Sequence, residues 1–195
     1  MTEQRHHPPS PALELDYRVR LAAFDFLREQ LAVKGEVLPR QVLAAGFEFQ
    51  GQRVPLIGPQ GIFKPAILPE VPLTITTVPV IEGRARPYED EIGSDGLLKY
   101  RYRGTDPRHR DNVGLRLAMT RQTPLIYLYG VIPGEYLPRW PVFVVRDEPD
   151  DLSFSIAVEQ EGVNSESVAE YDLSAGAALA ATRRYATRLF TQRMH

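Results

Sequence analysis

The sequence predicts an α+β protein in which a curved, mostly antiparallel β-barrel or sheet is flanked by N- and C-terminal helices. Near the N-terminus, apolar side chains recur at helical spacing, and the C-terminal segment is rich in alanine and free of proline. The middle of the chain instead holds short segments rich in Val, Ile, Thr, Phe and Tyr, separated by Gly, Pro or Asp. Few helical crossovers join these segments, which favours antiparallel pairing.

We expect four parts along the chain. Residues 1–11 are polar and proline-rich, which is typical of a disordered tail. Residues 12–46 form an N-terminal helical segment, with one helix over residues 12–34 and a short one over 38–45, each followed by a glycine. Residues 47–160 form the β-rich domain, and residues 173–195 form a long C-terminal helix.

Within residues 47–160 the pattern predicts a hairpin, five strands and one helix. The hairpin joins residues 47–49 to 54–57 through Gln50-Gly51-Gln52. A short helix is expected over residues 112–121. The strands are expected over residues 73–80, 97–103, 125–132, 141–146 and 152–159.

The composition excludes several classes of protein. The 195 residues are 43% hydrophobic and 25% charged, as in ordinary globular domains. The absence of cysteine excludes disulfides, thiolate nucleophiles and zinc sites that need sulfur. Neither a secretory signal nor an apolar run of membrane-spanning length is visible, so we expect a cytoplasmic protein with no membrane partner.

Charge is unevenly distributed along the chain, although the net charge is only −2. Residues 99–121 carry seven basic side chains and two acidic ones, a net charge of +5. Residues 147–172 carry nine acidic side chains and no Lys or Arg. The sequence therefore predicts a positive face and a negative face, and the positive one suits nucleic acid.

Acidic, aromatic and basic residues come together between positions 88 and 110. Tyr88-Glu89-Asp90-Glu91 is followed by Tyr100, Tyr102 and the basic run Arg108-His109-Arg110. Carboxylates accept hydrogen bonds from the exocyclic amine of cytosine, and aromatic rings stack on unpaired bases. Basic side chains hold phosphates. This combination is what a reader of a flipped base requires.

The middle of the chain resembles the SRA (SET- and RING-associated) domain, a member of the PUA-like barrel group. Five segments agree with this family in order and approximate spacing over residues 58–146, with Phe63 and Lys64 in place of the His-Arg of the first motif. The whole arrangement is similar to the N-terminal half of bacterial modification-dependent HNH endonucleases. The segments are residues 61–65 (Gly-Ile-His-Arg-Pro in the family), 88–91 (Tyr-Glu-Asp-Asp), 102–104 (Tyr-Thr-Gly), 112–118 (Gly-Asn-X-Ala-Leu) and 134–145, which stands where the family has a Tyr-Asp-Gly stretch before a strand. The Tyr-Asp-Gly motif itself is missing from this chain.

The resemblance implies a module that binds double-stranded DNA and flips a modified cytosine, 5-methyl or 5-hydroxymethyl, into a pocket. Tyr88 and Tyr102 would be the stacking rings, with Tyr100 in reserve, and Asp90 or Glu91 would meet the base edge. The run 108–110 would be the loop that fills the space left by the base. The residues implied in DNA binding are Lys64, Arg101, Arg103, Arg108, His109, Arg110, Arg116 and Arg121.

The residues leave several alternatives open. Side chains alternate along a strand, so Tyr100 and Tyr102 are expected on the same face, and the tyrosines could instead pack the sheet. The acidic residues could form a solvated turn. The chain could be a PUA- or EVE-like RNA binder, a homodimeric interaction module, or a metal-dependent enzyme that uses the acidic cluster around Asp90. No HNH, His-X-Glu-X-X-His or Gly-X-Ser-X-Gly motif is present. We therefore predict no catalytic residue, metal site or cofactor in this chain, with catalysis in the parent protein assigned to an HNH domain.

Overall fold

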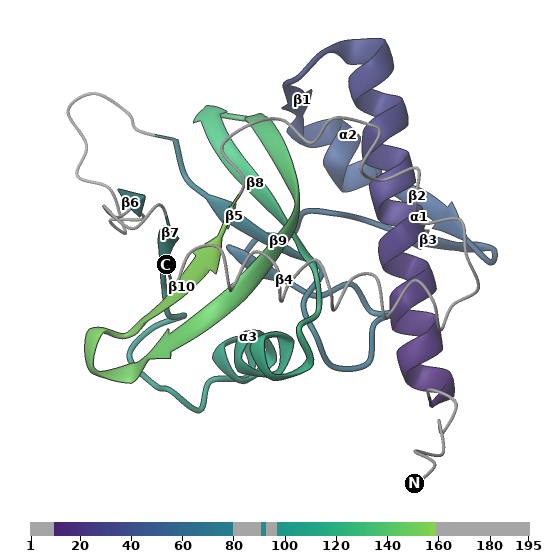
Figure 1. The fold of residues 1–195 in the computed structure, drawn as a ribbon. Helices are drawn as coiled ribbons and strands as arrows, with labels where there is room; N and C mark the ends of the chain where they lie inside the picture. Colours follow the sequence, from purple (N-terminus) through teal and green to yellow (C-terminus); the bar gives the residue numbers. More distant parts are fainter. Residues whose placement is uncertain (1–9, 80–90, 93–96, 159–195) are drawn as a thin grey trace, which may run out of the picture.

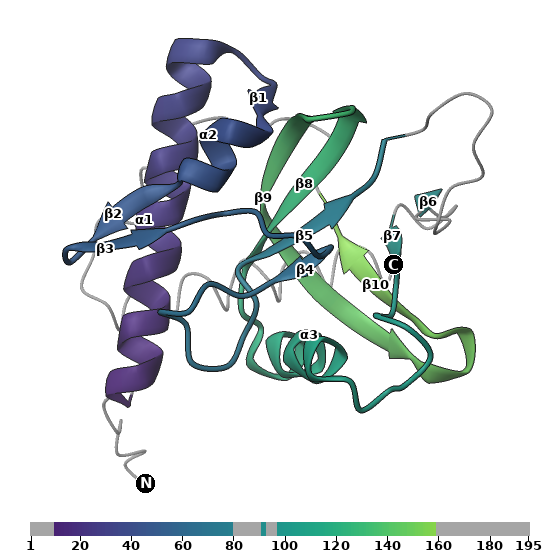
Figure 2. The ribbon, with the colours of Figure 1, turned by 180° about the vertical axis from the view of Figure 1, so that it is seen from behind.

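The computed structural model describes residues 10–79, 91–92 and 97–158. A curled sheet lies at its centre, with helix α1 (Pro11–Lys34) along one side and helix α3 (Arg110–Arg121) beneath the strands (Figure 1). The view from behind shows that the short helix α2 (Arg40–Ala45) stays on the α1 side (Figure 2). The predicted α+β class with a curved, mostly antiparallel sheet is confirmed at this level. The predicted C-terminal helix over 173–195 lies outside the described residues.

Helix α1 has nearly the predicted bounds. It begins at Pro11, one residue earlier than expected, because Ser10 caps it: the Ser10 hydroxyl accepts from the Leu13 amide at 3.4 Å. It ends at Gly35, whose φ of 88° suits glycine. Residues 10 and 11 therefore belong to the helix start rather than to a disordered tail, and residues 1–9 lie outside the described range.

The predicted helix over residues 38–45 is wrong at its beginning. Leu38–Pro39 forms the short strand β1, which pairs with β9, and α2 begins only at Arg40. A proline disfavours helical geometry in the residue before it, so Leu38 is held extended. The helix ends as predicted, at Gly46.

The predicted hairpin exists, but its second arm is earlier in the chain than expected. Strand β2 (Phe47–Phe49) pairs with β3 (Gln52–Val54). The connection is a two-residue turn, Gln50-Gly51, with both residues at positive φ, 52° and 78°. Such turns match the twist of antiparallel strands. The pairing therefore starts at Gln52 rather than at Val54.

The main sheet has eight strands and is antiparallel except where β5 and β8 run parallel. Strand β8 (Leu125–Ile132) has the predicted bounds, whereas β5, β7 and β10 lie within the predicted ranges and are shorter. The order along the sheet is β4 (Ile62–Phe63), β5 (Thr74–Thr77), β8, β9 (Glu135–Glu148), β10 (Ser153–Ala157), β7 (Leu97–Arg101) and β6 (Glu91–Ile92), with β1 paired to β9 outside this path.

Strand β9 is longer than the predicted segment 141–146. Its first part pairs with β8 and its second part with β10. The register shifts between Leu125 and Tyr127, whose partners are Val142 and Arg139, so Trp140 and Pro141 together stand opposite one residue. A bulge of this kind accommodates a proline, which cannot donate to a regular ladder.

The sheet separates two apolar cores. Ile126 and Leu128 of β8 join the core that α1 covers, whereas Leu125 and Tyr127 join the core on the α3 side. Successive residues of a strand point to opposite faces, so one strand supplies both cores.

A buried ion pair fixes α1 to the rest of the fold. The Arg20 side chain is 2% exposed, and its Nε donates to the Asp16 carboxylate at 2.6 Å. Its Nη1 donates to the carbonyl oxygens of Pro72, at 2.8 Å, and Pro124, at 3.0 Å. These two prolines precede β5 and β8, so a single guanidinium ties the helix to both parallel strands.

Candidate nucleic-acid interface

The basic loop before α3 is held in place by one buried amide. Asn112 is fully buried, and its Oδ1 accepts from the Arg103 amide at 2.7 Å. Its Nδ2 donates to the carbonyl oxygens of Arg103, at 3.1 Å, and Asp106, at 2.9 Å. Sequence reasoning assigned Asn112 only to a helix start. The structure makes it the anchor of the loop that was predicted to enter DNA.

Helix α3 begins two residues before the predicted position. His109 is its N-cap, and its Nδ1 accepts from the Asp111 amide at 3.2 Å. This cap brings Arg110 into the first turn, where its side chain is 82% exposed. The adjacent Arg108 is also exposed, and no side-chain partner is found for it among the described residues.

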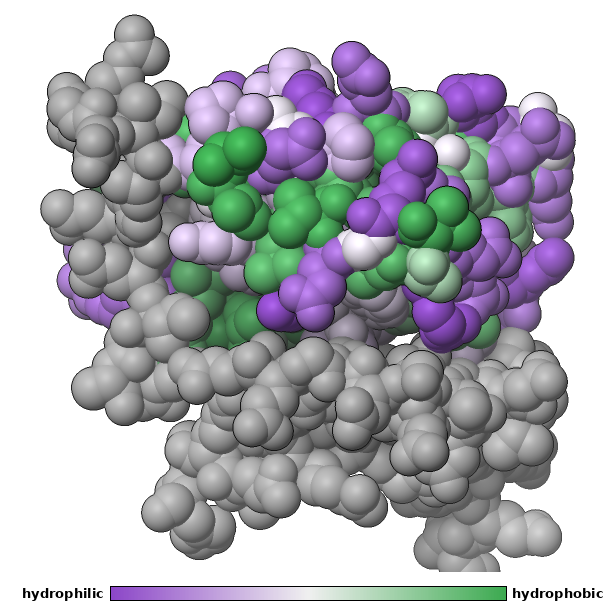
Figure 3. Space-filling model, turned by 90° about the horizontal axis from the view of Figure 1, so that it is seen from above, coloured by the Kyte–Doolittle hydropathy of each residue, from purple (hydrophilic) through white to green (hydrophobic). Residues whose placement is uncertain are grey.

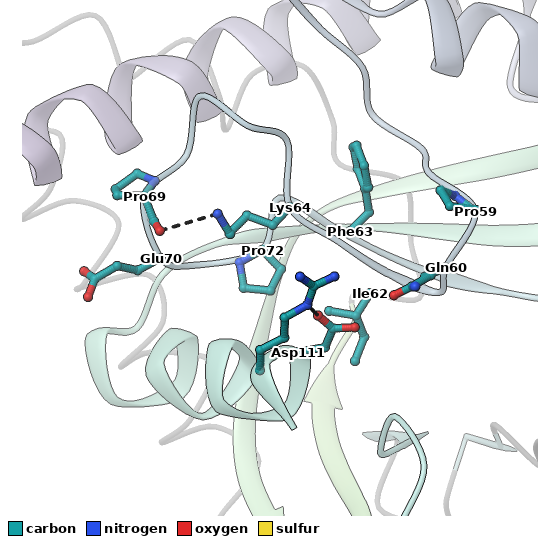
Figure 4. Close-up of a pocket in the computed structure, with 10 residues that line it drawn as sticks. Pro59, Gln60, Ile62, Phe63, Lys64, Pro69, Glu70, Pro72 and Asp111 are labelled. Atoms are coloured by element: carbon teal, nitrogen blue, oxygen red, sulfur yellow. Dashed lines mark hydrogen bonds and ion pairs between the residues drawn. The ribbon is translucent and has the colours of Figure 1, made fainter. Parts of the chain in front are cut away.

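A cavity of about 480 Å³ lies between the loop that follows β4 and the beginning of α3 (Figure 4). Lys64 and Arg110, which are far apart in the sequence and were both predicted to contact DNA, contribute to its wall. Ile62, Phe63 and Pro72 supply an apolar part of the lining. The remaining lining residues are Pro59, Gln60, Pro69, Glu70 and Asp111.

The polar groups of the cavity are only partly committed to intramolecular bonds. The Lys64 ammonium donates to the Leu68 carbonyl at 2.8 Å. It donates more weakly to the Pro69 carbonyl, at 3.4 Å, as the dashed line in Figure 4 marks. An ammonium has three donors, so one remains for a ligand. The buried Oδ2 of Asp111 has no hydrogen-bond partner, while its Oδ1 lies 3.5 Å from Arg110 Nε. The cavity therefore offers donors from two cations, whereas the covered Oδ2 of Asp111 lies 3.8 Å from His109 Nδ1.

Other predicted contacts have partners within the protein. Arg116 Nε lies 2.5 Å from an Asp147 carboxylate oxygen, and Arg121 Nη1 lies 2.6 Å from Glu70. Arg101 Nη1 donates to the Asp151 carbonyl at 3.0 Å. Among the predicted DNA contacts, the basic side chains with the fewest or weakest partners in the described part of the protein are therefore Lys64, Arg103, Arg108 and Arg110.

Tyr100, in β7, and Tyr102, just after the strand, both lie in the core. Tyr100 is 5% exposed and Tyr102 is 2% exposed, on the same face as alternation predicted. The Tyr100 hydroxyl donates to the Thr76 carbonyl at 3.2 Å, and the Tyr102 ring packs 4.7 Å from that of Phe154. Neither ring has a face open to a base. Tyr100 and Tyr102 therefore pack the sheet, which is the alternative that the sequence left open.

The hydroxyl of Tyr102 belongs to a hydrogen-bonded triad. It donates to the Asp147 carboxylate and accepts from Arg116 Nη2 at 3.1 Å. Burial raises the pKa of Tyr102, and the bond to Asp147 adds to this, while Arg116 acts in the opposite direction. The bond to Asp147 also raises the pKa of Arg116. Sequence reasoning missed Asp147, which lies in the acidic stretch and carries no motif.

The other residues of the predicted base pocket are Tyr88, Asp90 and Glu91. Glu91 lies in β6, where its backbone pairs with Lys99 of β7. Tyr88 and Asp90 lie outside the described residues, and their roles stay predictions. Within the described ranges, no three His, Asp or Glu side chains come together as a metal site. No helix in these ranges has the length and apolar character needed to cross a membrane.

Comparison with known proteins adds no relative. No protein-family model, no curated protein and no solved structure matches the chain. The resemblance to SRA domains therefore depends on its ordered motifs alone.

Proposed function

We propose that this chain is a DNA-binding module that recognises a modified cytosine by base flipping and serves as the specificity domain of an HNH-type modification-dependent restriction endonuclease. It would act on DNA of the bacterial nucleoid and contribute no catalytic residue of its own. The ordered SRA-like motifs over residues 58–146 support this function.

One observation carries the proposal furthest. Lys64 and Arg110 were expected to contact DNA from two separate motifs, and both line one cavity. Arg108 lies beside them in a loop that Asn112 anchors from within. A fixed loop with exposed cations next to a partly apolar cavity suits a phosphate and an adjoining unpaired nucleotide.

The experiment is a binding titration with three matched duplexes: unmodified, 5-methylcytosine and 5-hydroxymethylcytosine, each at two salt concentrations. We expect tighter binding of a modified duplex. Lys64→Ala and Arg110→Ala should each weaken all three complexes and reduce the salt slope by about one unit, because each removes one phosphate contact. Arg28→Ala is the matched control, since Arg28 lies on α1 in an exposed pair with Asp25.

Equal affinity for the three duplexes would contradict the proposal, and salt slopes that neither variant changes would contradict phosphate contacts at Lys64 and Arg110. The alternative is a PUA- or EVE-like RNA-binding module, because the same cations could hold RNA phosphates. A competition experiment distinguishes the two functions, with structured RNA and unlabelled duplex DNA as competitors against the bound modified duplex. If RNA displaces the modified duplex at a lower concentration than duplex DNA does, the RNA-binding alternative is favoured.

A further inference from the structure

Tyr129 differs from every other aromatic residue in the described part of the chain. It is 41% exposed, whereas the other five tyrosines there are at most 9% exposed. The phenylalanines and the single tryptophan of these ranges are buried or half-buried. A ring that stacks on an unpaired base must be open to solvent before the base arrives. Among the described tyrosines only Tyr129 meets this condition, and no described phenylalanine or tryptophan is as exposed.

The ring of Tyr129 continues the inner face of the curled sheet beyond its core. Tyr127 and Tyr129 share one face of β8, with ring centres 6.2 Å apart and planes at 62°. Tyr127 is buried in the α3-side core, and its hydroxyl lies 3.1 Å from that of Thr77 on β5. Tyr129 is therefore supported by a fixed neighbour on one side and open on the other.

The parallel strands β5 and β8 end among exposed apolar residues. Val78, Val131 and Ile132, which are 55%, 41% and 56% exposed, follow Thr77 and Tyr129, the last paired residues of the two strands. The view from above shows apolar side chains gathered among polar ones at this end of the molecule (Figure 3). Exposed apolar side chains at the end of these strands suit the face of a base better than a phosphate, because a base offers an apolar surface.

The backbone beside Tyr129 is tightly fixed. A Cβ on Gly130 would lie 2.6 Å from the Thr77 carbonyl oxygen and 2.7 Å from Pro79 Cδ. Only glycine fits there, so the chain that leaves β5 packs directly against β8 at the residue after Tyr129. A ring on a fixed strand loses little conformational freedom when a ligand stacks on it.

The strand register places this ring within reach of the basic cavity. Ile62, which lines the cavity, pairs with Ile75, and Ile75 lies opposite Tyr127, two residues before Tyr129. With about 4.8 Å between strands and about 3.3 Å per residue, the separation between Ile62 and Tyr129 is about 12 Å. One strand of DNA carries a phosphate about every 3.4 Å along its axis, so this span covers about three or four nucleotides.

We propose that Tyr129 is the aromatic platform on which the extruded base stacks. This role rests on the proposed function and deepens it, since it assigns the accessible ring to β8 rather than to Tyr100 or Tyr102. The curl of the sheet also brings β7 close to β5, where the Tyr100 hydroxyl meets the Thr76 carbonyl.

The test compares the wild-type chain with Tyr129→Ala, Tyr129→Leu and Tyr129→Phe in the titration with modified and unmodified duplexes. We expect Ala and Leu to lower the affinity for the modified duplex by about tenfold or more, in the range of one stacked base, and Phe to retain it. The salt slope should not change in any of them, because the side chain carries no charge. Urea unfolding of each variant verifies that the fold is intact.

The outcomes separate this inference from the proposed function. If the wild type prefers the modified duplex and Tyr129→Ala keeps that preference, the platform is refuted and the function stands. If Leu binds as well as Phe, the residue supplies apolar bulk and the stacking role is refuted. If light scattering shows that Tyr129→Ala converts a dimer to a monomer with unchanged DNA affinity, the face is a self-interface. If the wild type shows no preference, the proposed function and the platform both fail.

Discussion

Replacing Asn112 with alanine tests whether one buried amide holds the basic loop. The substitution removes three hydrogen bonds that join α3 to the backbone of Arg103 and Asp106. Each such bond contributes about 0.5–1.5 kcal/mol net, so the three together contribute about 1.5–4.5 kcal/mol. Asp106 is exposed, and water can replace part of what is lost there. We therefore expect a loss of about 2 kcal/mol in the free energy of unfolding.

Urea unfolding followed by circular dichroism measures this loss. With an m-value of about 2 kcal/mol per M, the midpoint should fall by about 1 M. Thr120→Ala is the matched control on the same helix, because Thr120 is exposed and its hydroxyl bonds only to the Arg116 carbonyl. A loss below about 0.5 kcal/mol for Asn112→Ala, equal to that of the control, would refute the assignment of Asn112 as the anchor.

Two further substitutions probe the buried polar groups. Arg20→Met leaves the nearly buried Asp16 carboxylate without its counter-ion, and we expect a loss of about 3–5 kcal/mol in urea unfolding. The double substitution with Asp16→Leu should recover part of this, and a double variant as unstable as the single one would contradict the reasoning. The second is Tyr102→Phe. The raised pKa of Tyr102 means that its contribution to stability is complete below pH 10, the usual tyrosine pKa, and is lost as pH rises above that value towards the native pKa. Tyr102→Phe should therefore lose stability less steeply than the wild type between pH 10 and 11, as urea midpoints would show; equal slopes would contradict this.

Regular patterns between clear boundaries allowed the sequence to predict several elements closely. Strand β8 has the predicted bounds because its β-branched and aromatic residues are enclosed by Pro124 and Pro133. Strand β9 was predicted too short, since Pro138 and Pro141 look like strand breakers. The bulge and the change of pairing partner that make Pro141 tolerable are long-range features.

The candidate site, too, depends on long-range features that the sequence pattern does not predict. Alternation correctly placed Tyr100 and Tyr102 on one face, but it could not tell whether that face lies inside or outside the curl. Tyr129 lies in a strand with no motif and was overlooked, because its exposure depends on where the core ends. The convergence of Lys64 and Arg110 likewise depends on how the loop after β4 meets α3.

The sharing of β8 between both cores has a consequence for how the protein divides into units. A boundary between residues 46 and 47 separates a helical segment from a β domain in the sequence, yet the core under α1 contains Ile126 and Leu128 from the middle of the sheet. Since the neighbouring residues of the same strand complete the opposite core, loosening one layer disturbs the backbone of the other. The N-terminal helices are thus part of one cooperative unit with the proposed nucleic-acid face. A substitution beneath α1 should therefore weaken the proposed binding without touching the ligand.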